Sequence, residues 1–342
     1  MGSIGDVRVV CLGEAMVVLR PEGDQSLAEA QTLSRSVGGA EANVARGLAA
    51  LGVRAAWVSR LGEDPFGDVV TDDLAVRGVE VEVQRDPDRP TGLYVKEPAP
   101  GGSRMHYYRT GSAAAAMDAD LLDRPGVAAA LASAEVVHTS GITVGILEEG
   151  SALVARLLEL RDELGFRLSV DLNWRPALWT ERSITPLLDL LRAADIVLLG
   201  ADEARAALGV CTPDELRELL GERPRLVIKA DSHAAGEHDP DGSAAHVPAL
   251  QVDIVEPVGA GDGFAAGYLA ALVDGVGAVG RLRQGHLVAA GVLAATGDHA
   301  APPAAGVRAR LLDCSGDDWA AIRVSAVGID SPVLTSQEAR SR

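Results

Sequence analysis

The segment DIVEPVGAGDGFAAGYL, residues 253–269, places a glycine-rich turn and a carboxylate directly before an apolar helical pattern. Gly259, Ala260 and Gly261 have little or no side chain, so their backbone N–H groups can approach a ligand closely. If the helix begins near Asp262, these N–H groups lie at its positive end and favour an anion such as phosphate. The Asp262 carboxylate could then accept a proton from a hydroxyl group that attacks a phosphoryl group.

Two other interpretations of the same turn stay open at this point. In the first, the glycines form an ordinary turn and Asp262 is only the N-cap of the helix. In the second, the glycines belong to a dinucleotide-binding fingerprint. That interpretation fits less well, because the third glycine is misplaced and the motif lies late in the chain rather than in a first βα unit.

The composition indicates a large globular α/β protein. The chain has 342 residues, of which 47% are apolar, enough for one large domain or for one domain with a small attachment. The formal net charge of −18 argues against nucleic acid as a partner, and an anionic substrate would need locally placed arginines. Three well-separated cysteines and the lack of a secretory or membrane-length apolar run predict a cytoplasmic protein with no membrane partner.

Short apolar runs alternate with helical patterns along most of the chain. Residues 40–52 and 152–165 each place apolar residues on one helical face and end in glycine. Six apolar runs predict buried strands: residues 7–13, 55–62, 134–141, 167–173, 194–200 and 225–231. The alternation predicts an α/β fold with a doubly wound, mostly parallel sheet, which binds its ligands at the carboxyl ends of the strands.

Two segments lack this alternation. Residues 14–37 and about 79–112 contain short β signals with no helix between them, and we expect them to form a small β-sheet lid on the α/β body. The tail from about residue 303 is uneven and ends in polar residues. The predicted organisation is therefore one domain over residues 1–305, which includes the lid, and a partly disordered C-terminal extension over residues 306–342.

A family resemblance emerges when two stretches are read together. SVGGAEANVARGLAALG (36–52) and EPVGAGDGFAAGYLAAL (256–272), about 220 residues apart, resemble the two signatures of the ribokinase-like (PfkB) sugar kinases. The resemblance covers about residues 5–300 and favours the anion-binding interpretation of the glycine turn. It implies a ribokinase-like α/β body with a β-sheet lid. It also implies ATP-dependent phosphorylation of a sugar hydroxyl with Mg²⁺, often with a monovalent cation such as K⁺ near the nucleotide.

The resemblance implies a role for each residue that matches a family motif. Asp262 matches the catalytic base. Glu203, in GADEA, matches the acid that helps to order Mg²⁺ and the phosphates, and is therefore an indirect metal contact. The anion hole matches Gly259, Ala260 and Gly261. The sugar-contacting signature matches Gly38, Gly39 and Asn43.

Within the family, three finer features resemble 2-keto-3-deoxygluconate kinases. They are TGLYVKE (91–97), HYYRTGSAAAAM (106–117) and DLNWRPALW (171–179). A keto-deoxy sugar acid has a carboxylate, which needs a cation or a fork of hydrogen-bond donors. Arg109 and Arg175 suit this role, because arginine binds carboxylates through two N–H groups at once.

The other polar residues of these stretches have roles that remain open. Arg175 could bind a phosphate instead of the substrate carboxylate. Asp171 and Asn173 end a predicted strand and could orient Arg175 or the phosphates. Three tyrosines could pack on the sugar and donate to its oxygens, or could simply pack within the lid: Tyr94, Tyr107 and Tyr108.

The expected nucleotide loop departs from the family pattern. The family usually has K-x-G-x-x-G after a late strand, whereas residues 229–242 read KADSHAAGEHDPDG. Lys229 matches the lysine of this pattern and is expected to bind the nucleotide, but Asp231 and Ala234 stand where glycines are expected. A β-carbon there could crowd the nucleotide. Residues 236–242 also lack the apolar pattern of a strand and predict a loop.

These features predict a kinase that transfers phosphate from ATP to 2-keto-3-deoxygluconate. One alternative is a PfkB kinase for a neutral sugar such as fructose or ribose, which the two arginines argue against. A second alternative is a sugar-acid-binding protein without turnover, suggested by the altered nucleotide loop. The expected partners are therefore a small sugar acid and a nucleotide, and an exposed lid sheet would favour a homodimer.

Overall fold

A computed structural model describes residues 7–23, 25–99, 102–148, 150–230 and 233–335. Its main element is a nine-stranded sheet in which β12 is antiparallel to both of its neighbours, β11 and β13, and all the other strand pairs are parallel. In spatial order the strands are β13 (Ala244–Pro248), β12 (Ala234–His238), β11 (Arg225–Ala230), β10 (Ile196–Gly200), β9 (Arg167–Asp171), β8 (Val136–Ser140), β1 (Val9–Leu12), β4 (Ala55–Gly62) and β5 (Glu80–Asp86). All six predicted strands are present and lie in this sheet.

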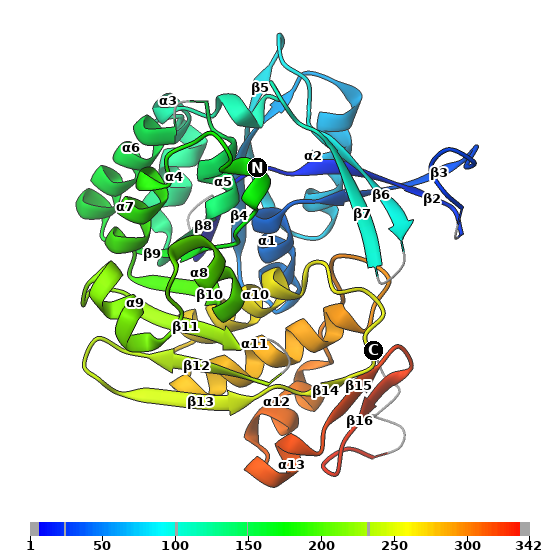
Figure 1. Ribbon diagram of the computed structural model, residues 1–342, viewed down its shortest axis with the longest axis vertical. Coiled ribbons are helices and arrows are strands. Elements are labelled where there is room, and N and C mark those ends of the chain that lie inside the picture. The colour runs from blue at the N-terminus through cyan, green and yellow to red at the C-terminus, as the bar shows by residue number, and fades with distance from the viewer. Residues whose placement is uncertain (1–6, 24, 100–101, 149, 231–232, 336–342) are drawn as a thin grey trace.

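Helices cover both faces of the sheet, which confirms the doubly wound fold (Figure 1). One face is covered by α1 (Ala40–Ala50), α2 (Pro65–Val76), α10 (Ala260–Val273), α11 (Ala278–Leu293) and α12 (Ala305–Asp313). The other is covered by α3 (Ala119–Leu122), α4 (Pro125–Ser133), α5 (Gly141–Ile146), α6 (Gly150–Leu164), α7 (Thr185–Ala193), α8 (Ala201–Leu208) and α9 (Pro213–Leu220). Alternate residues of β1 enter the two cores, Val9 with the first and Val10 with the second, because side chains alternate along a strand.

The lid is a four-stranded sheet that projects from the α/β body (Figure 1). Its strands lie in the order β3 (Leu33–Gly38), β2 (Met16–Pro21), β6 (Leu93–Ala99) and β7 (Gly102–Tyr108). The prediction that residues 79–86 belong to the lid is wrong, because β5 pairs in parallel with β4 in the main sheet. The helix α2 between β4 and β5 was missed, and its crossover returns β5 to the edge of the sheet. There only alternate residues, Val81 and Val83, pack on the core.

Residues 306–335 of the C-terminal extension, which was expected to be partly disordered, are folded. The helices α12 and α13 (Gly316–Ala320) are followed by β15 (Arg323–Ser325) and β16 (Gly328–Asp330), which form a three-stranded sheet with β14 (Gln251–Val252). Trp319 and Ile322 are buried in the first core. Isolated apolar residues that hold a segment on the core produce no periodic pattern in the sequence, so this packing could not be predicted. The expected disorder of residues 336–342 lies outside the described residues.

The loop predicted over residues 236–242 is also partly wrong, since residues 236–238 belong to β12. The loop was predicted because the segment is polar, yet its charged residue Glu237 is buried in the strand. Its carboxylate accepts hydrogen bonds from the Tyr268 hydroxyl at 2.7 Å and from Nε of Arg281 at 3.0 Å. A buried charge with such partners is tolerated in a strand. None of the described helices combines the length and apolar character needed to cross a membrane.

Candidate active site

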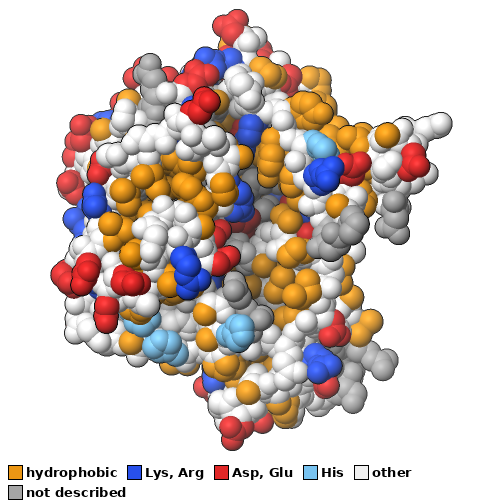
Figure 2. Space-filling view, in the orientation of Figure 1, with side chains coloured by type: hydrophobic (Ala, Val, Ile, Leu, Met, Phe, Trp, Pro, Cys, Tyr) orange, Lys and Arg blue, Asp and Glu red, His pale blue; other side chains and the backbone are white. Residues whose placement is uncertain are grey.

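A pocket of about 340 Å³ lies between the carboxyl ends of the parallel strands and the lid (Figure 2). This is the position that the doubly wound fold predicts for a ligand site. Most of the predicted site residues line it: Gly39, Asn43, Tyr94, Tyr107, Arg109, Asp171, Asn173, Arg175, Glu203, Lys229, Gly259, Gly261 and Asp262. Residues more than 200 positions apart in the sequence therefore meet in one cavity.

The glycine turn forms the N-terminus of α10. Gly259 is the N-cap residue and has a φ of 87°, in the left-handed region that favours glycine. A Cβ atom at Gly259 would also collide with the carbonyl group of Asp298. The first backbone bond of the helix joins the N–H of Gly263 to the carbonyl of Gly259, so the three preceding amides have no partner within the helix. These amides form an anion-binding end beside the pocket.

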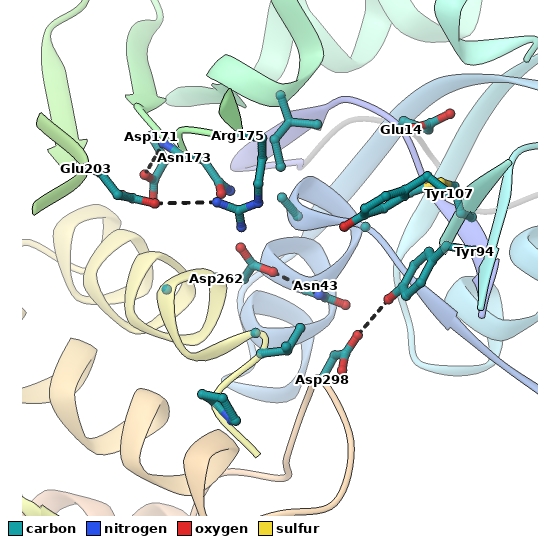
Figure 3. Close-up of a pocket in the computed structure, with 18 of the residues that line it drawn as sticks. Glu14, Asn43, Tyr94, Tyr107, Asp171, Asn173, Arg175, Glu203, Asp262 and Asp298 are labelled. Atoms are coloured by element: carbon teal, nitrogen blue, oxygen red, sulfur yellow. Dashed lines mark hydrogen bonds and ion pairs between the residues drawn. The ribbon is translucent and has the colours of Figure 1, made fainter. Parts of the chain in front are cut away.

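Asp262 lies in the first turn of α10 with its carboxylate turned into the pocket (Figure 3). Its Oδ2 accepts a hydrogen bond of 2.9 Å from Nδ2 of Asn43, which lies on α1. Burial raises the pKa of Asp262 to about 7; the Asn43 bond lowers it, while the charges of Asp171 and Glu41 raise it further. A carboxylate with a pKa near 7 is well matched to accept a proton at neutral pH.

A lysine flanks the same helix end. Nζ of Lys229, at the end of β11, lies 3.1 Å from Oδ2 of Asp171, at the end of β9. Burial alone would lower the pKa of Lys229, but Asp171 and Glu203 together raise it above its usual value. A Cβ atom at Gly261 would lie 3.6 Å from this Nζ. The glycine therefore leaves open the space in which an anion could contact both the amides and the ammonium group.

Arg175 and Glu203 complete this side of the pocket (Figure 3). Nη1 of Arg175 lies 3.5 Å from Oε1 of Glu203, and half of the Arg175 side chain is exposed. Burial and the charge of Asp171 raise the pKa of Glu203, while Lys229 counteracts them. Asn173 has a φ of 39°, rare for a residue other than glycine, and its N–H donates to Oδ1 of Asp171 at 3.1 Å. Backbone strain of this kind is often found at functional sites.

Residues on the lid, and the residues that they contact, form the other side of the pocket. The rings of Tyr94 and Tyr107 lie with their centroids 5.4 Å apart. Nε and Nη2 of Arg109 both donate to Oε2 of the buried Glu14, at 2.7 Å in the case of Nε. The Ser112 hydroxyl donates to the other oxygen of Glu14 at 2.9 Å. Arg109, which was predicted to contact the substrate carboxylate, therefore lines the pocket as one partner of an ion pair with Glu14.

Three predicted contacts are not among the residues that line the pocket: Gly38, Tyr108 and Ala260. Tyr108 is 62% exposed, because neighbouring residues of a strand point to opposite faces and Tyr107 takes the face toward the pocket. Ala234, the expected crowding residue of the nucleotide loop, pairs with Ala230 in the β11–β12 hairpin. Asp231 lies outside the described residues.

The other residues of the pocket were not predicted from the sequence; they are Glu14, Met16, Ala40, Ile142, Pro257, Val258 and Asp298. Glu14 could have been found, because it is an acidic residue directly after a buried strand. Asp298, in contrast, follows α11 in the stretch GDHA, which has no local feature that points to a ligand. Its carboxylate accepts a hydrogen bond of 3.0 Å from the Tyr94 hydroxyl (Figure 3).

Comparison with known proteins agrees with this geometry. Residues 6–305 match the pfkB family of carbohydrate kinases. The chain belongs to this family. It is 31% identical to a 2-dehydro-3-deoxygluconokinase from Thermoproteus tenax over 87% of this chain and 91% of that protein. The family membership confirms that the protein is a carbohydrate kinase.

Two solved structures have the same fold. A PfkB protein from Polaromonas superposes with a TM-score of 0.76 and is 30% identical, covering 90% of this chain and 100% of its own. A candidate ribokinase II from E. coli, in complex with ATP and Mg²⁺, superposes with a TM-score of 0.75 at 21% identity and covers 85% and 94% of the two chains. The ribokinase-like fold class expected from the two signatures is thus confirmed.

Proposed function

We propose that this pfkB family kinase transfers the γ-phosphoryl group of ATP to the terminal hydroxyl of 2-keto-3-deoxygluconate and forms the 6-phosphate. The principal support is the position of Asp262, which lies between the anion-binding end of α10 and the lid and has a pKa near 7. The name of the Thermoproteus tenax relative, which refers to the same sugar acid, supports the choice of substrate.

In the proposed reaction, Asp262 accepts the proton of the sugar hydroxyl as its oxygen attacks the γ-phosphorus. The new P–O bond forms while the bond between the γ-phosphorus and the β,γ-bridging oxygen breaks, and ADP leaves. The unpartnered amides at the start of α10 and the Lys229 ammonium group would lie beside the transferred group and stabilise its negative charge. These groups are fixed before the substrate arrives, so little reorganisation is required at the moment of transfer.

Asp171 and Glu203 are the residues that fit a role toward Mg²⁺. The two carboxylates are close enough that the charge of Asp171 raises the pKa of Glu203. Mg²⁺ is usually held by one or two carboxylates, waters and substrate phosphates, so two acids beside a phosphate site suffice. When bound, the ion would neutralise charge on the β- and γ-phosphate oxygens. The Lys229 ammonium group, 3.1 Å from Oδ2 of Asp171, would orient that acid.

The sugar acid would lie between Asp262 and the lid. Arg109 uses one edge of its guanidinium group on Glu14, which leaves the edge formed by Nη1 and Nη2 for the substrate carboxylate. The Tyr94–Tyr107 pair, Gly39 and Asn43 would contact the sugar body. Arg175 would bind either the carboxylate or a phosphate.

Lid closure would exclude water from the transferred phosphoryl group. The outer strands β3 and β7 leave two open edges on the lid sheet. We therefore propose that two copies of the chain pair through these edges, which would remove the exposed backbone groups from water. Light scattering at several protein concentrations tests this arrangement, and a monomer at all of them contradicts it.

A coupled ADP-release assay tests the reaction. The sugars are 2-keto-3-deoxygluconate, its C4 epimer, fructose and ribose, each with ATP and Mg²⁺. The proposal predicts the highest kcat/KM for one of the two sugar acids. A preference for fructose or ribose would support a neutral-sugar kinase, an alternative consistent with the neutral Arg109–Glu14 pair. Binding of the sugar acid without ADP release would support the non-catalytic alternative.

A further inference from the structure

Lys96 is buried at the junction of the lid and the body. It lies on β6, is 3% exposed, and its Nζ is 2.7 Å from Oε2 of Glu256 and 3.0 Å from Oδ1 of Asp298. Tyr94, two residues earlier on the same face of β6, donates its hydroxyl to Oδ2 of Asp298 (Figure 3). One lid strand thus holds both oxygens of Asp298 and one oxygen of Glu256.

Both acidic residues also contact the turn that begins α10, Glu256 through its carboxylate and Asp298 through its backbone. Oε1 of Glu256 accepts a hydrogen bond of 3.1 Å from the N–H of Val258, directly before Gly259. The backbone of Asp298 packs so closely on Gly259 that a Cβ atom there would collide with the Asp298 carbonyl. Lys96 therefore connects the lid, through two carboxylates, to the segment that presents the anion-binding amides.

The use of lysine at this position is itself informative. The chain has 29 arginines and only two lysines, Lys96 and Lys229, and both lie buried or nearly so beside the pocket. A compact ammonium group can lie between two carboxylates where a planar guanidinium needs more room and a different geometry. All other basic side chains of Lys/Arg type in the sequence are arginines. The two lysines are both found where the ammonium group lies beside acidic side chains.

We propose that Lys96 is a positioning residue for phosphoryl transfer: its ammonium group fixes the 256–259 turn and joins it to the lid. The inference rests on the proposed function, since it concerns the orientation of the anion hole in that reaction. It also bears on the monovalent cation that the family often uses near the nucleotide. Among the described residues, the two acids that flank the anion hole, Glu256 and Asp298, already share the Lys96 ammonium. The site does not fit a second cation between them, so turnover is independent of K⁺.

The test compares wild type with Lys96→Ala in buffers that contain K⁺, NH₄⁺ or only tetramethylammonium. Wild-type kcat is expected to be the same in all three. In tetramethylammonium, Lys96→Ala is expected to lower kcat by about tenfold or more with little change in the KM of the sugar. NH₄⁺ or K⁺, which can enter the space left by the side chain, should restore part of the loss. ATP affinity, measured by calorimetry, should weaken and recover in the same way, and this readout does not depend on turnover.

Two further variants separate positioning from stability. Glu256→Gln keeps the shape of the side chain and should lower kcat even if Lys96→Ala fails to fold. Arg281→Met removes a comparable buried ion pair, at Glu237, among residues that do not line the pocket, and should lower the melting temperature but not kcat.

A K⁺ requirement in the wild type, or wild-type kcat in both Lys96→Ala and Glu256→Gln, would overturn the inference. Wild type that phosphorylates none of the sugars would instead contradict the proposed function. In that case the positioning role of Lys96 is tested by ATP affinity alone. Equal ATP affinities in wild type and Lys96→Ala would contradict that role.

Discussion

The two halves of the pocket are built differently. The phosphate half consists of the first turn of α10 and the ends of β9 to β11, and its charged groups, Asp171, Glu203 and Lys229, lie on rigid elements of the body. The sugar half consists of the lid and the segment after β1. There, charged groups are neutralised by partners far away in the sequence, as Arg109 is by Glu14 and Lys96 by Glu256.

This difference indicates which half sets the rate of phosphoryl transfer and which half sets the specificity for the sugar. Groups on rigid elements can be aimed at the charge that develops in the transition state and need not move. Groups on the lid can contact the sugar only when the lid is correctly positioned on the body. The ion pairs between lid and body, Arg109–Glu14 and Lys96–Glu256, fix that position. Substitutions in the phosphate half should therefore act mainly on kcat, and substitutions of lid groups that contact the sugar mainly on the KM of the sugar. Lys96 is the exception within the lid, because it is joined to the 256–259 turn and should act on kcat.

The largest effect is expected for Asp262→Asn. Loss of the general base should lower kcat by about 10²–10⁴-fold, because the attacking hydroxyl then keeps its proton. The amide remains a partner for Asn43, so the affinities for sugar and ATP should stay close to those of wild type. Single-turnover kinetics and calorimetry measure the two quantities separately. A variant with nearly wild-type kcat would exclude Asp262 as the base.

The next largest effect separates the two arginines. Arg109→Ala should raise the KM of the sugar acid by about ten- to a hundredfold, the loss expected for a charge-assisted hydrogen bond, and leave the KM of ATP unchanged. Arg175→Ala should do the same if Arg175 also binds the carboxylate. A rise in the KM of ATP alone would instead assign Arg175 to a phosphate and place it in the phosphate half.

A neutral sugar and a paired variant provide the controls. Turnover of fructose, where detectable, should be affected less by Arg109→Ala, because fructose has no carboxylate. Arg109→Ala also leaves the Glu14 carboxylate buried without its cation, so the variant is compared with Glu14→Gln/Arg109→Ala. An equal loss for both sugars in both variants would show that Arg109 supports the lid rather than the carboxylate.

The phosphate half and the sugar half also differ in how much of each could be predicted from the sequence. The parallel strands, α1, α10 and the phosphate half follow from local patterns: apolar runs, a glycine that must adopt a positive φ at 259, and polar residues directly after strands. Asp298 and Lys96 could not be predicted as site residues. Their position depends on which lid strand meets which loop of the body, a long-range packing result that neither residue encodes locally.

The errors have the same physical origin. Residues 79–86 resemble a lid strand because an edge strand of the main sheet buries only one face. Glu237 resembles a loop residue because its partners, Tyr268 and Arg281, are supplied by α10 and α11. In each case the local composition is polar, and burial is decided by elements distant in the sequence.

The pH dependence tests the phosphate half next. Because burial raises the pKa of Asp262 to about 7, the group is protonated and inactive below that pH. The value of kcat/KM should therefore fall by about tenfold per pH unit below about pH 7 and level off above it. Asp262→Asn should have no such acidic limb. An acidic limb that begins near pH 4 in wild type would show that the raised pKa does not govern the reaction.

Stability should change with pH in the opposite direction. The folded state holds the Asp262 proton up to about pH 7, whereas the unfolded chain releases it near pH 4, so the folded state binds more protons between these values. This group therefore costs stability as the pH rises from about 4 to 7. At pH 8, Asp262→Asn should increase the free energy of unfolding by about 2 kcal/mol, less than the full shift implies because the side chain is partly exposed to the pocket. Urea denaturation at pH 5 and pH 8 measures the difference.

The smallest effect concerns where the phosphate half ends. Ala234 lies in the β11–β12 hairpin and is not among the pocket-lining residues, so Ala234→Gly should change the Kd of ATP by less than about twofold while lowering stability by about 0.5–1 kcal/mol. For Asp231 the prediction rests on the sequence: a negative charge two residues after Lys229 should repel ATP, and Asp231→Gly should lower the Kd by about two- to fivefold. Because salt screens such repulsion, the gain should shrink at high ionic strength. Calorimetry on both single variants, at low and high salt, distinguishes charge from crowding. If Asp231→Gly leaves the Kd of ATP unchanged, the phosphate half does not extend beyond Lys229. If Ala234→Gly lowers the Kd of ATP and the effect persists at high salt, the hairpin crowds the nucleotide.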